Sequence, residues 1–164
     1  MKNIFLIILA LFTFTAMAYI NPIQGVHDSP DPGVLYDGHN FYAVTTEGWD
    51  SHYFPIWKSP DLFKWSQQGF VFLTKPSWAV QNFWAPEMHI VGHQYLVYYT
   101  ARDSTGFLCI GVAYSDSPLG PFIDKGVPLL KNVTEGVIDC TIHQENNQIH
   151  LIYKVDGNAH GKPT

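Results

Sequence analysis

A tight-turn signal followed by an aromatic-rich segment occurs three times in this chain. The first copy begins at Asp37-Gly38, the second at Gly92-His93 and the third at Asn146-Asn147. The interval from Gly38 to Gly92 equals that from His93 to Asn147. Such dipeptides favour two-residue hairpin turns. Since a short apolar segment also precedes each turn (33–36, 86–91 and 137–143), the chain is predicted to repeat a β-hairpin.

Further strands are expected between the hairpins, at 52–58, 70–74 and 107–114, and no segment has the period of a long amphipathic helix. A repeat of about 50 residues with about four strands per unit is typical of a β-propeller blade. A single β-sandwich is the alternative, but the repeated order of motifs favours the propeller. Because the 164 residues hold only about two and a half units, we expect an all-β fold that is a truncated propeller.

The composition argues against several classes of partner. Only 14% of the residues are charged, the formal net charge is −5, and Lys and Arg form no run. Nucleic-acid binders normally carry a basic surface, so this class is disfavoured, as is an anionic membrane surface. Aromatic residues make up 15% of the chain, which argues against disorder.

The N-terminal segment 1–18 has the pattern of a secretory signal peptide. Lys2 precedes an apolar stretch from Ile4 to Phe14, and Ala16-Met17-Ala18 fits a small-residue cleavage site. The apolar stretch is too short to span a membrane comfortably. We therefore expect a secreted or periplasmic protein without a membrane anchor after cleavage, whose folded region is 19–164.

Export would permit a disulfide between the two cysteines, Cys109 and Cys140. Cys109 lies within the apolar segment 107–114, where a buried free thiol is the common outcome. The sequence leaves both states open.

Six segments resemble motifs of glycoside hydrolase family 43 and occur in the family's order. They are HDSPDPGVL at 27–35, WKSPDLFKW at 57–65, FWAPE at 83–87, SDSPLGPF at 115–122, VID at 137–139 and KVDGN at 154–158. The resemblance covers residues 21–164. It implies a five-bladed β-propeller, present here to about two and a half blades, that hydrolyses arabinose- or xylose-containing plant polysaccharides with inversion.

Two aspartates are the candidate catalytic residues. Inverting hydrolysis needs two carboxyl groups roughly 6.5–9.5 Å apart. Asp31 and Asp139 each begin an inner strand of a different blade, so both are expected at one axial cavity. By resemblance, Asp31 is the general base, and Asp139 tunes the pKa of the catalytic acid and orients it. Asp28 is the competitor for the base, but only Asp31 has the family's spacing to Gly33; Cys140 stands where the family usually has proline.

No residue is assigned as the catalytic acid. The family's acid is a glutamate on a later blade, and none of the four glutamates of this chain has that position (Glu47, Glu87, Glu135 and Glu145). The alternatives to a glycosidase are therefore a non-catalytic carbohydrate-binding propeller and an inactive truncated fragment. The retention of both aspartates argues mildly against the first alternative.

Sugar rings are bound by flat apolar faces and hydrogen-bonding edges. Phe83 and Trp84 lead into the second inner strand, Trp78 lies in a predicted loop, and Glu87 is a candidate wall residue. For each aromatic residue, core packing is an equally good interpretation. No His/Asp cluster has metal-ligand spacing, so neither a metal nor a cofactor is predicted. The expected partner is a polysaccharide or oligosaccharide that contains arabinose or xylose.

Overall fold

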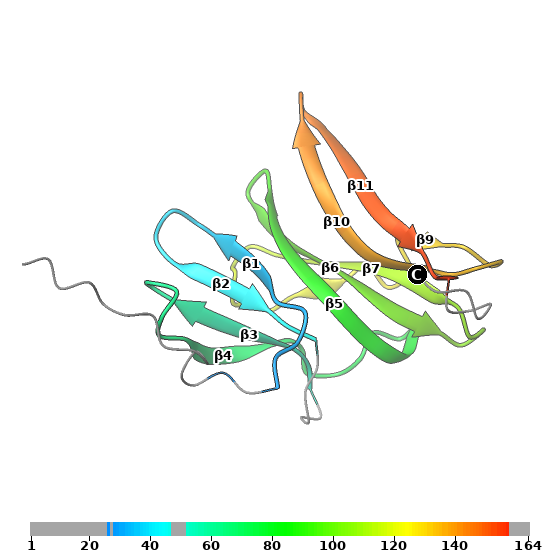
Figure 1. Ribbon diagram of the computed structural model, residues 1–164, viewed down its shortest axis with the longest axis horizontal. Coiled ribbons are helices and arrows are strands. Elements are labelled where there is room, and N and C mark those ends of the chain that lie inside the picture. Colours follow the sequence, from blue (N-terminus) through cyan, green and yellow to red (C-terminus); the bar gives the residue numbers. More distant parts are fainter. Residues whose placement is uncertain (1–25, 27, 47–51, 158–164) are drawn as a thin grey trace, which may run out of the picture.

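The computed structural model describes residue 26 and residues 28–46 and 52–157, and its regular elements there are all β-strands (Figure 1). The predicted signal peptide, residues 1–18, lies outside the described residues. Within those ranges, no helix is long and apolar enough to cross a membrane.

The first sheet contains four antiparallel strands in sequence order. These are β1 (Gly33–Tyr36), β2 (Phe41–Val44), β3 (Tyr53–Ser59) and β4 (Ser66–Phe72). Each strand pairs with the next along the chain, which is the arrangement of a propeller blade. The innermost strand is β1, which follows the segment that contains Asp31.

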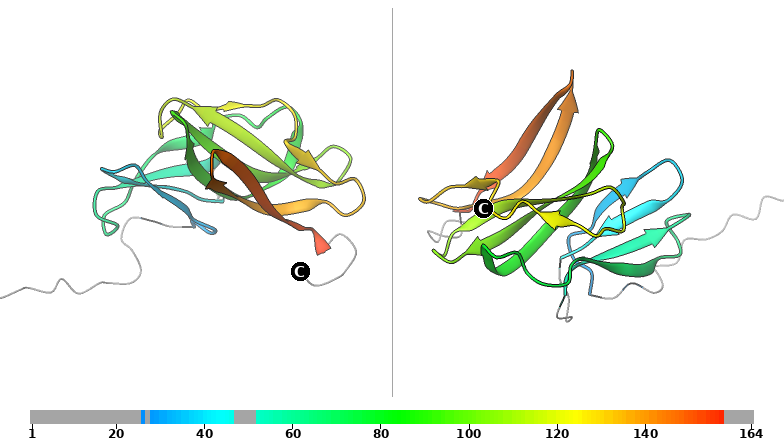
Figure 2. Two further views of the ribbon diagram at one scale, coloured as in Figure 1. Left: turned by 90° about the horizontal axis from the view of Figure 1, so that it is seen from above. Right: turned by 180° about the vertical axis from the view of Figure 1, so that it is seen from behind.

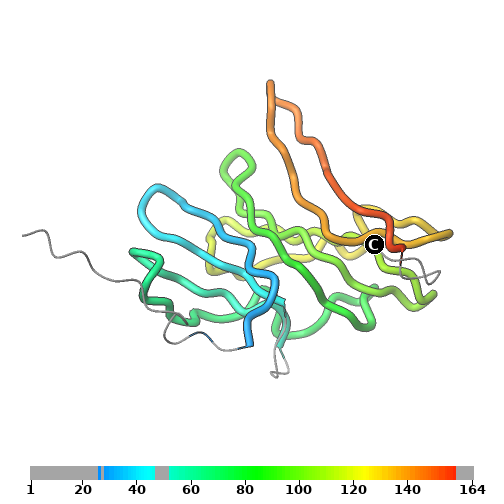
Figure 3. The backbone as a smooth tube through the Cα atoms, viewed as in Figure 1, coloured from blue at the N-terminus to red at the C-terminus, as the bar shows by residue number. Residues whose placement is uncertain are grey.

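The second sheet repeats this order of strands. The third sheet contains only two described strands, which correspond to the first hairpin of the other two sheets. The second sheet comprises β5 (Ala79–Val91), β6 (Gln94–Asp103), β7 (Leu108–Ser115), β8 (Ile123–Asp124) and β9 (Leu130–Lys131), which pairs with β7. The third comprises β10 (Val137–Glu145) and β11 (Gln148–Val155). Figure 3 traces the chain through these sheets in succession. The predicted two blades and a half are thus present.

Positive φ angles occur at all three predicted hairpin turns. Asn146 and Asn147 have φ angles of 50° and 60°, and a type I′ turn requires positive φ at both central residues. Gly38 and Gly92 also have positive φ, at 97° and 62°. The constant spacing of these turns therefore reflects equivalent hairpins in successive blades.

Neighbouring blades stack face to face (Figure 2). Apolar side chains fill the spaces between them. Phe54 of the first blade packs against Phe83 and Tyr99 of the second. A second cluster between blades two and three includes Tyr98, Ile110, Val137 and Cys140. Gly33 marks the closest approach of the inner strands, since a Cβ there would lie 2.5 Å from the carbonyl oxygen of Pro86.

Both cysteines are buried free thiols. Of the two states that the sequence left open, the structure thus shows free thiols rather than a disulfide. Burial raises the pKa of Cys109 to about 11 and that of Cys140 to about 12. Each thiol therefore stays protonated at neutral pH.

Candidate active site

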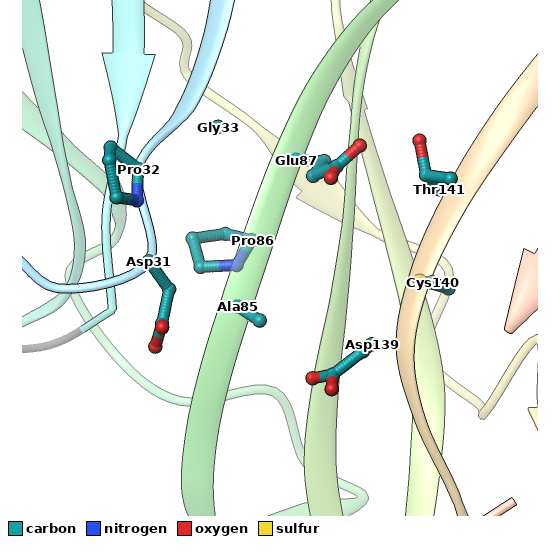
Figure 4. A pocket seen from close by; sticks show the side chains of 9 residues that line it. All are labelled: Asp31, Pro32, Gly33, Ala85, Pro86, Glu87, Asp139, Cys140 and Thr141. Atoms are coloured by element: carbon teal, nitrogen blue, oxygen red, sulfur yellow. The ribbon is translucent and has the colours of Figure 1, made fainter. Parts of the chain in front are cut away.

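The inner strands of all three sheets line one cleft of about 270 Å³ (Figure 4). The first blade contributes Asp31, Pro32 and Gly33, the second Ala85, Pro86 and Glu87, and the third Asp139, Cys140 and Thr141. The structure thus brings the two predicted catalytic aspartates, which are far apart in the sequence, to the same cleft. Asp28, the competing candidate for the base, is not among the lining residues.

Asp31, Ala85 and Asp139 are equivalent positions, separated by the same interval that separates the hairpin turns. All three have positive φ, at 51°, 39° and 52°. Positive φ is uncommon outside glycine, and strained backbone of this kind clusters at functional sites. In Figure 4, Asp31 and Asp139 flank β5 on either side of Ala85. The same backbone turn therefore places one residue of each blade at the cleft, and two of the three are aspartates.

The Asp31 carboxylate is held from the neighbouring strand. Its Oδ2 accepts a hydrogen bond from Oγ1 of Thr46 at 2.8 Å. The same Oγ1 accepts a hydrogen bond from the backbone N–H of Ala85, at 2.9 Å. Thr46 is buried, whereas Asp31 is exposed to solvent. A buried hydroxyl thus links the exposed aspartate to the second blade.

Asp139 has a charged partner. Its Oδ2 lies 2.7 Å from Nζ of Lys154, and the hydrogen bond to Asp139 raises the pKa of Lys154. Its backbone N–H donates to Oγ1 of Thr100 at 3.3 Å. The pair therefore presents a carboxylate whose charge is partly balanced by a neighbouring ammonium group.

Sequence reasoning assigned no role to Thr46 or Lys154. The signal that could have found them is the repeat itself, because Thr46, Thr100 and Lys154 recur at the same interval as Asp31, Ala85 and Asp139. Each lies on the second strand of its blade or within two residues of its end, beside the equivalent position of the first set. The residues that hold the cleft-lining positions thus occupy equivalent positions themselves.

Glu87 lines the cleft on the same strand as Ala85, just beyond Pro86. Its Oε2 lies 3.1 Å from Nε2 of His89. In Figure 4 the Glu87 carboxylate lies on the side of β5 that faces Thr141. Of the four residues predicted to bind sugar, Glu87 is the one that the structure places at this cleft.

The three predicted aromatic wall residues lie elsewhere. Phe83 is 1% exposed and packs on Tyr53 in the core. Trp78 stacks on Tyr99, and its indole N–H donates to Oδ1 of Asp124 at 3.2 Å. Trp84 is half-buried and does not line the cleft. For Phe83 the core interpretation is therefore the one that the structure shows.

Comparison with known proteins identifies the family. The family model described as glycosyl hydrolases family 43 matches residues 19–163. The chain therefore belongs to glycosyl hydrolases family 43.

Within the described residues, no group of three or more His, Cys, Asp or Glu side chains could hold a metal ion.

Two curated relatives show which proteins the chain resembles. The extracellular endo-α-(1→5)-L-arabinanase 1 of Bacillus subtilis is 29% identical over 139 residues, which cover 78% of this chain and 40% of the relative. The xylosidase/arabinosidase 43A of Humicola insolens is 40% identical over 52 residues, which cover 32% of this chain and 16% of the relative. The chain thus spans less than half the length of these relatives.

Solved structures of the family show the same fold. A thermostable family-43 glycoside hydrolase superposes with a TM-score of 0.77 at 32% identity, covering 86% of this chain and 46% of that chain. An endo-arabinase from Bacteroides thetaiotaomicron superposes with a TM-score of 0.66 at 24% identity, covering 84% and 48%. The described sheets are thus the first two and a half blades of a five-bladed β-propeller.

Proposed function

We propose that the full-length protein is an exported, inverting glycoside hydrolase that acts on arabinose- or xylose-containing polysaccharides. The observation that carries the proposal is the convergence of Asp31 and Asp139, from the first and third blades, on one cleft. The names of the relatives, which are arabinanases, xylosidases and arabinosidases, support this substrate class. The signal-peptide pattern at 1–18 and the extracellular relative support export.

In this mechanism Asp31 is the general base. An inverting enzyme places a water between its base and the anomeric carbon, on the face opposite the leaving oxygen. The Asp31 carboxylate accepts a proton from that water while the water oxygen bonds to the anomeric carbon. The exposure of Asp31 suits this role, because the attacking water must reach it.

Asp139 acts on the catalytic acid rather than on the water. A negative charge close to a second carboxyl group raises the pKa of that group. The acid can then stay protonated until it donates to the departing sugar oxygen. We assign the acid to a carboxyl group of a later blade, because Glu87, the glutamate at this cleft, is paired with His89.

The test compares Asp31→Asn with Asp28→Asn in the full-length protein. General base catalysis contributes roughly 10²–10⁴-fold, so Asp31→Asn is expected to lower kcat on arabinan, xylan or the matching aryl glycosides by that factor. Asp28→Asn removes a nearby turn aspartate and is expected to retain most of the activity. The proposal fails if the two variants behave in the opposite way.

Product stereochemistry and binding complete the test. Proton NMR of the first-formed sugar distinguishes inversion from retention, and retention would refute the assignment of Asp31 as a base. Tight polysaccharide binding by the wild-type protein without any release of sugar would instead support the non-catalytic carbohydrate-binding propeller.

A further inference from the structure

Thr46 connects the first two blades at the candidate base. It lies two residues beyond the end of β2 with 7% exposure, and its backbone N–H donates to the carbonyl oxygen of Pro30 at 3.0 Å. Its backbone is therefore tied to the residue that precedes Asp31. We propose that Thr46 is a positioning residue that fixes the orientation of the Asp31 carboxylate in the cleft.

The direction of each hydrogen bond follows from the chemistry of the groups. The backbone N–H of Ala85 can only donate, so the Thr46 oxygen accepts from it. The ionised carboxylate of Asp31 can only accept, so the single Thr46 hydroxyl proton points to Oδ2. Because β-branched threonine also has restricted rotation about χ1, the hydroxyl is held on both sides.

The second blade provides an internal comparison. Thr100, the equivalent of Thr46, also accepts a backbone N–H from the next blade, that of Asp139. The position beside Thr100 that corresponds to Asp31 is Ala85, which has no carboxylate. The hydrogen bond from a backbone N–H of the next blade to the threonine hydroxyl is thus a repeated feature of the fold. The hydrogen bond from the threonine hydroxyl to a carboxylate is found at Asp31, the candidate base.

The consequence for catalysis rests on the proposed function of Asp31. A solvent-exposed aspartate samples several rotamers unless a neighbour holds it, and reaction rates are sensitive to misplacement of about 1 Å. The Thr46 hydroxyl engages Oδ2 and so directs the remaining carboxylate oxygen. Loss of this hydroxyl should slow the chemical step while leaving substrate binding nearly intact.

The experiment uses Thr46→Val, Thr46→Ser and the matched control Thr45→Val in the full-length protein. Thr45 is also buried, at 2% exposure, but its hydroxyl has no hydrogen-bond partner among the described residues. We expect Thr46→Val to lower kcat about 10- to 100-fold with KM changed less than about threefold. Thr46→Ser should restore most of kcat, and Thr45→Val should match the wild type.

Crystal structures of the same variants decide the inference independently of activity. We expect the Asp31 carboxylate to turn away from its wild-type position in Thr46→Val and to keep it in Thr45→Val and Thr46→Ser. An unmoved carboxylate in Thr46→Val overturns the inference, as does a kcat no lower than that of Thr45→Val. An inactive wild-type protein would refute the proposed function alone, because the crystal structures would still test the orientation. If Thr46→Val does not fold, Thr46→Ala and Thr45→Ala allow the same comparison.

Discussion

Nζ of Lys154 lies 2.7 Å from Oδ2 of Asp139, although Lys154 is opposite Ile138 in the register of β10 and β11. The register shifts between Ile138 and Thr141, and Asp139 lies in this bulge with a φ of 52°. Bulges re-aim side chains beside active sites. Here the bulge brings the carboxylate within reach of a residue that is not its direct cross-strand partner.

This ion pair leads to a prediction about pH dependence. Lys154→Met removes the positive charge that is paired with Asp139 of the cleft, so the carboxylic acids there become harder to ionise. The profile of kcat/KM against pH is therefore expected to move to higher pH, whereas Lys154→Arg should retain the wild-type profile. Both partners are partly exposed, and exposed pairs contribute little to stability, so the melting temperature should hardly change.

The control for Lys154→Met is Lys125→Met, which removes an equal charge from an exposed lysine that is not paired with Asp139. Initial rates across the pH range, on whichever glycoside the wild type cleaves, provide the comparison. A shift to lower pH, or the same shift in both variants, would contradict the expected role of Lys154.

A second prediction concerns acid stability. Asp103 is 7% exposed and accepts hydrogen bonds from Lys131 and from the backbone and hydroxyl of Thr105. Burial by itself raises the pKa of Asp103, but these hydrogen bonds outweigh burial and lower it to about 2, below the usual value of 3.8. A carboxyl group with a depressed pKa stabilises the fold above its unfolded pKa and loses this effect as the pH falls towards its folded pKa.

Asp103→Asn is therefore expected to lower the free energy of unfolding by about 2 kcal/mol at pH 7. The difference from wild type should shrink below about pH 4 and nearly vanish near pH 2. Urea unfolding at several pH values measures it, with Asp116→Asn as the control because Asp116 is exposed. A difference that stays constant from pH 7 to pH 3 would show that the ionised carboxylate is not its source.

The repeat explains why so much of the fold was predictable. A turn with positive φ at Asn146 and Asn147 leaves a local sequence signal, and the aromatic strands beside the turns leave another. The strands β8 and β9 were not predicted because each is two residues long and too short for a periodic pattern. The start of β5 at Ala79 was also missed, since register shifts interrupt its alternation before Glu87.

The site was predictable only where it depends on topology. Asp31 and Asp139 share a cleft because each lies near the start of an inner strand, which the order of motifs had indicated. The direction of an individual side chain depends on local backbone geometry instead. Asn82 and Ala85 have φ angles of 60° and 39°, so alternation along β5 does not predict that Phe83 enters the core. The repeat marks Thr46 as one of a set of equivalent positions, but its contact with the next blade is seen only in the three-dimensional structure.

The two cysteines provide a third prediction. Thiolates rather than thiols react with alkylating agents, and the raised pKa values of about 11 and 12 leave very little thiolate at pH 8. Burial also blocks access to both sulfur atoms. Iodoacetamide should therefore leave Cys109 and Cys140 unmodified in the native protein and modify both in guanidinium chloride. Peptide mass spectrometry measures each site separately, and a disulfide-linked peptide from the unreduced protein would disprove the free-thiol state.

The last prediction concerns residues 19–164 produced alone. Large apolar side chains are exposed on strands at both ends of the stack of blades: Val34 and Tyr36 on β1, and Ile149, Ile152 and Tyr153 on β11. Among the described strands, β11 pairs only with β10, and an unpaired edge beside exposed apolar side chains promotes association. We therefore expect this segment to form oligomers or to precipitate at micromolar concentration.

Ile152→Lys should reduce this association, because a charged side chain on an edge strand opposes pairing with another chain. Val133→Lys is the control, since Val133 is also exposed but lies in a loop outside both end strands. Sedimentation velocity over a range of concentrations measures the oligomeric state of the wild-type segment and both variants. A monomeric wild-type segment with a cooperative melting transition would show that two and a half blades are self-sufficient. Equal effects of the two substitutions would show that association depends on net charge rather than on β11.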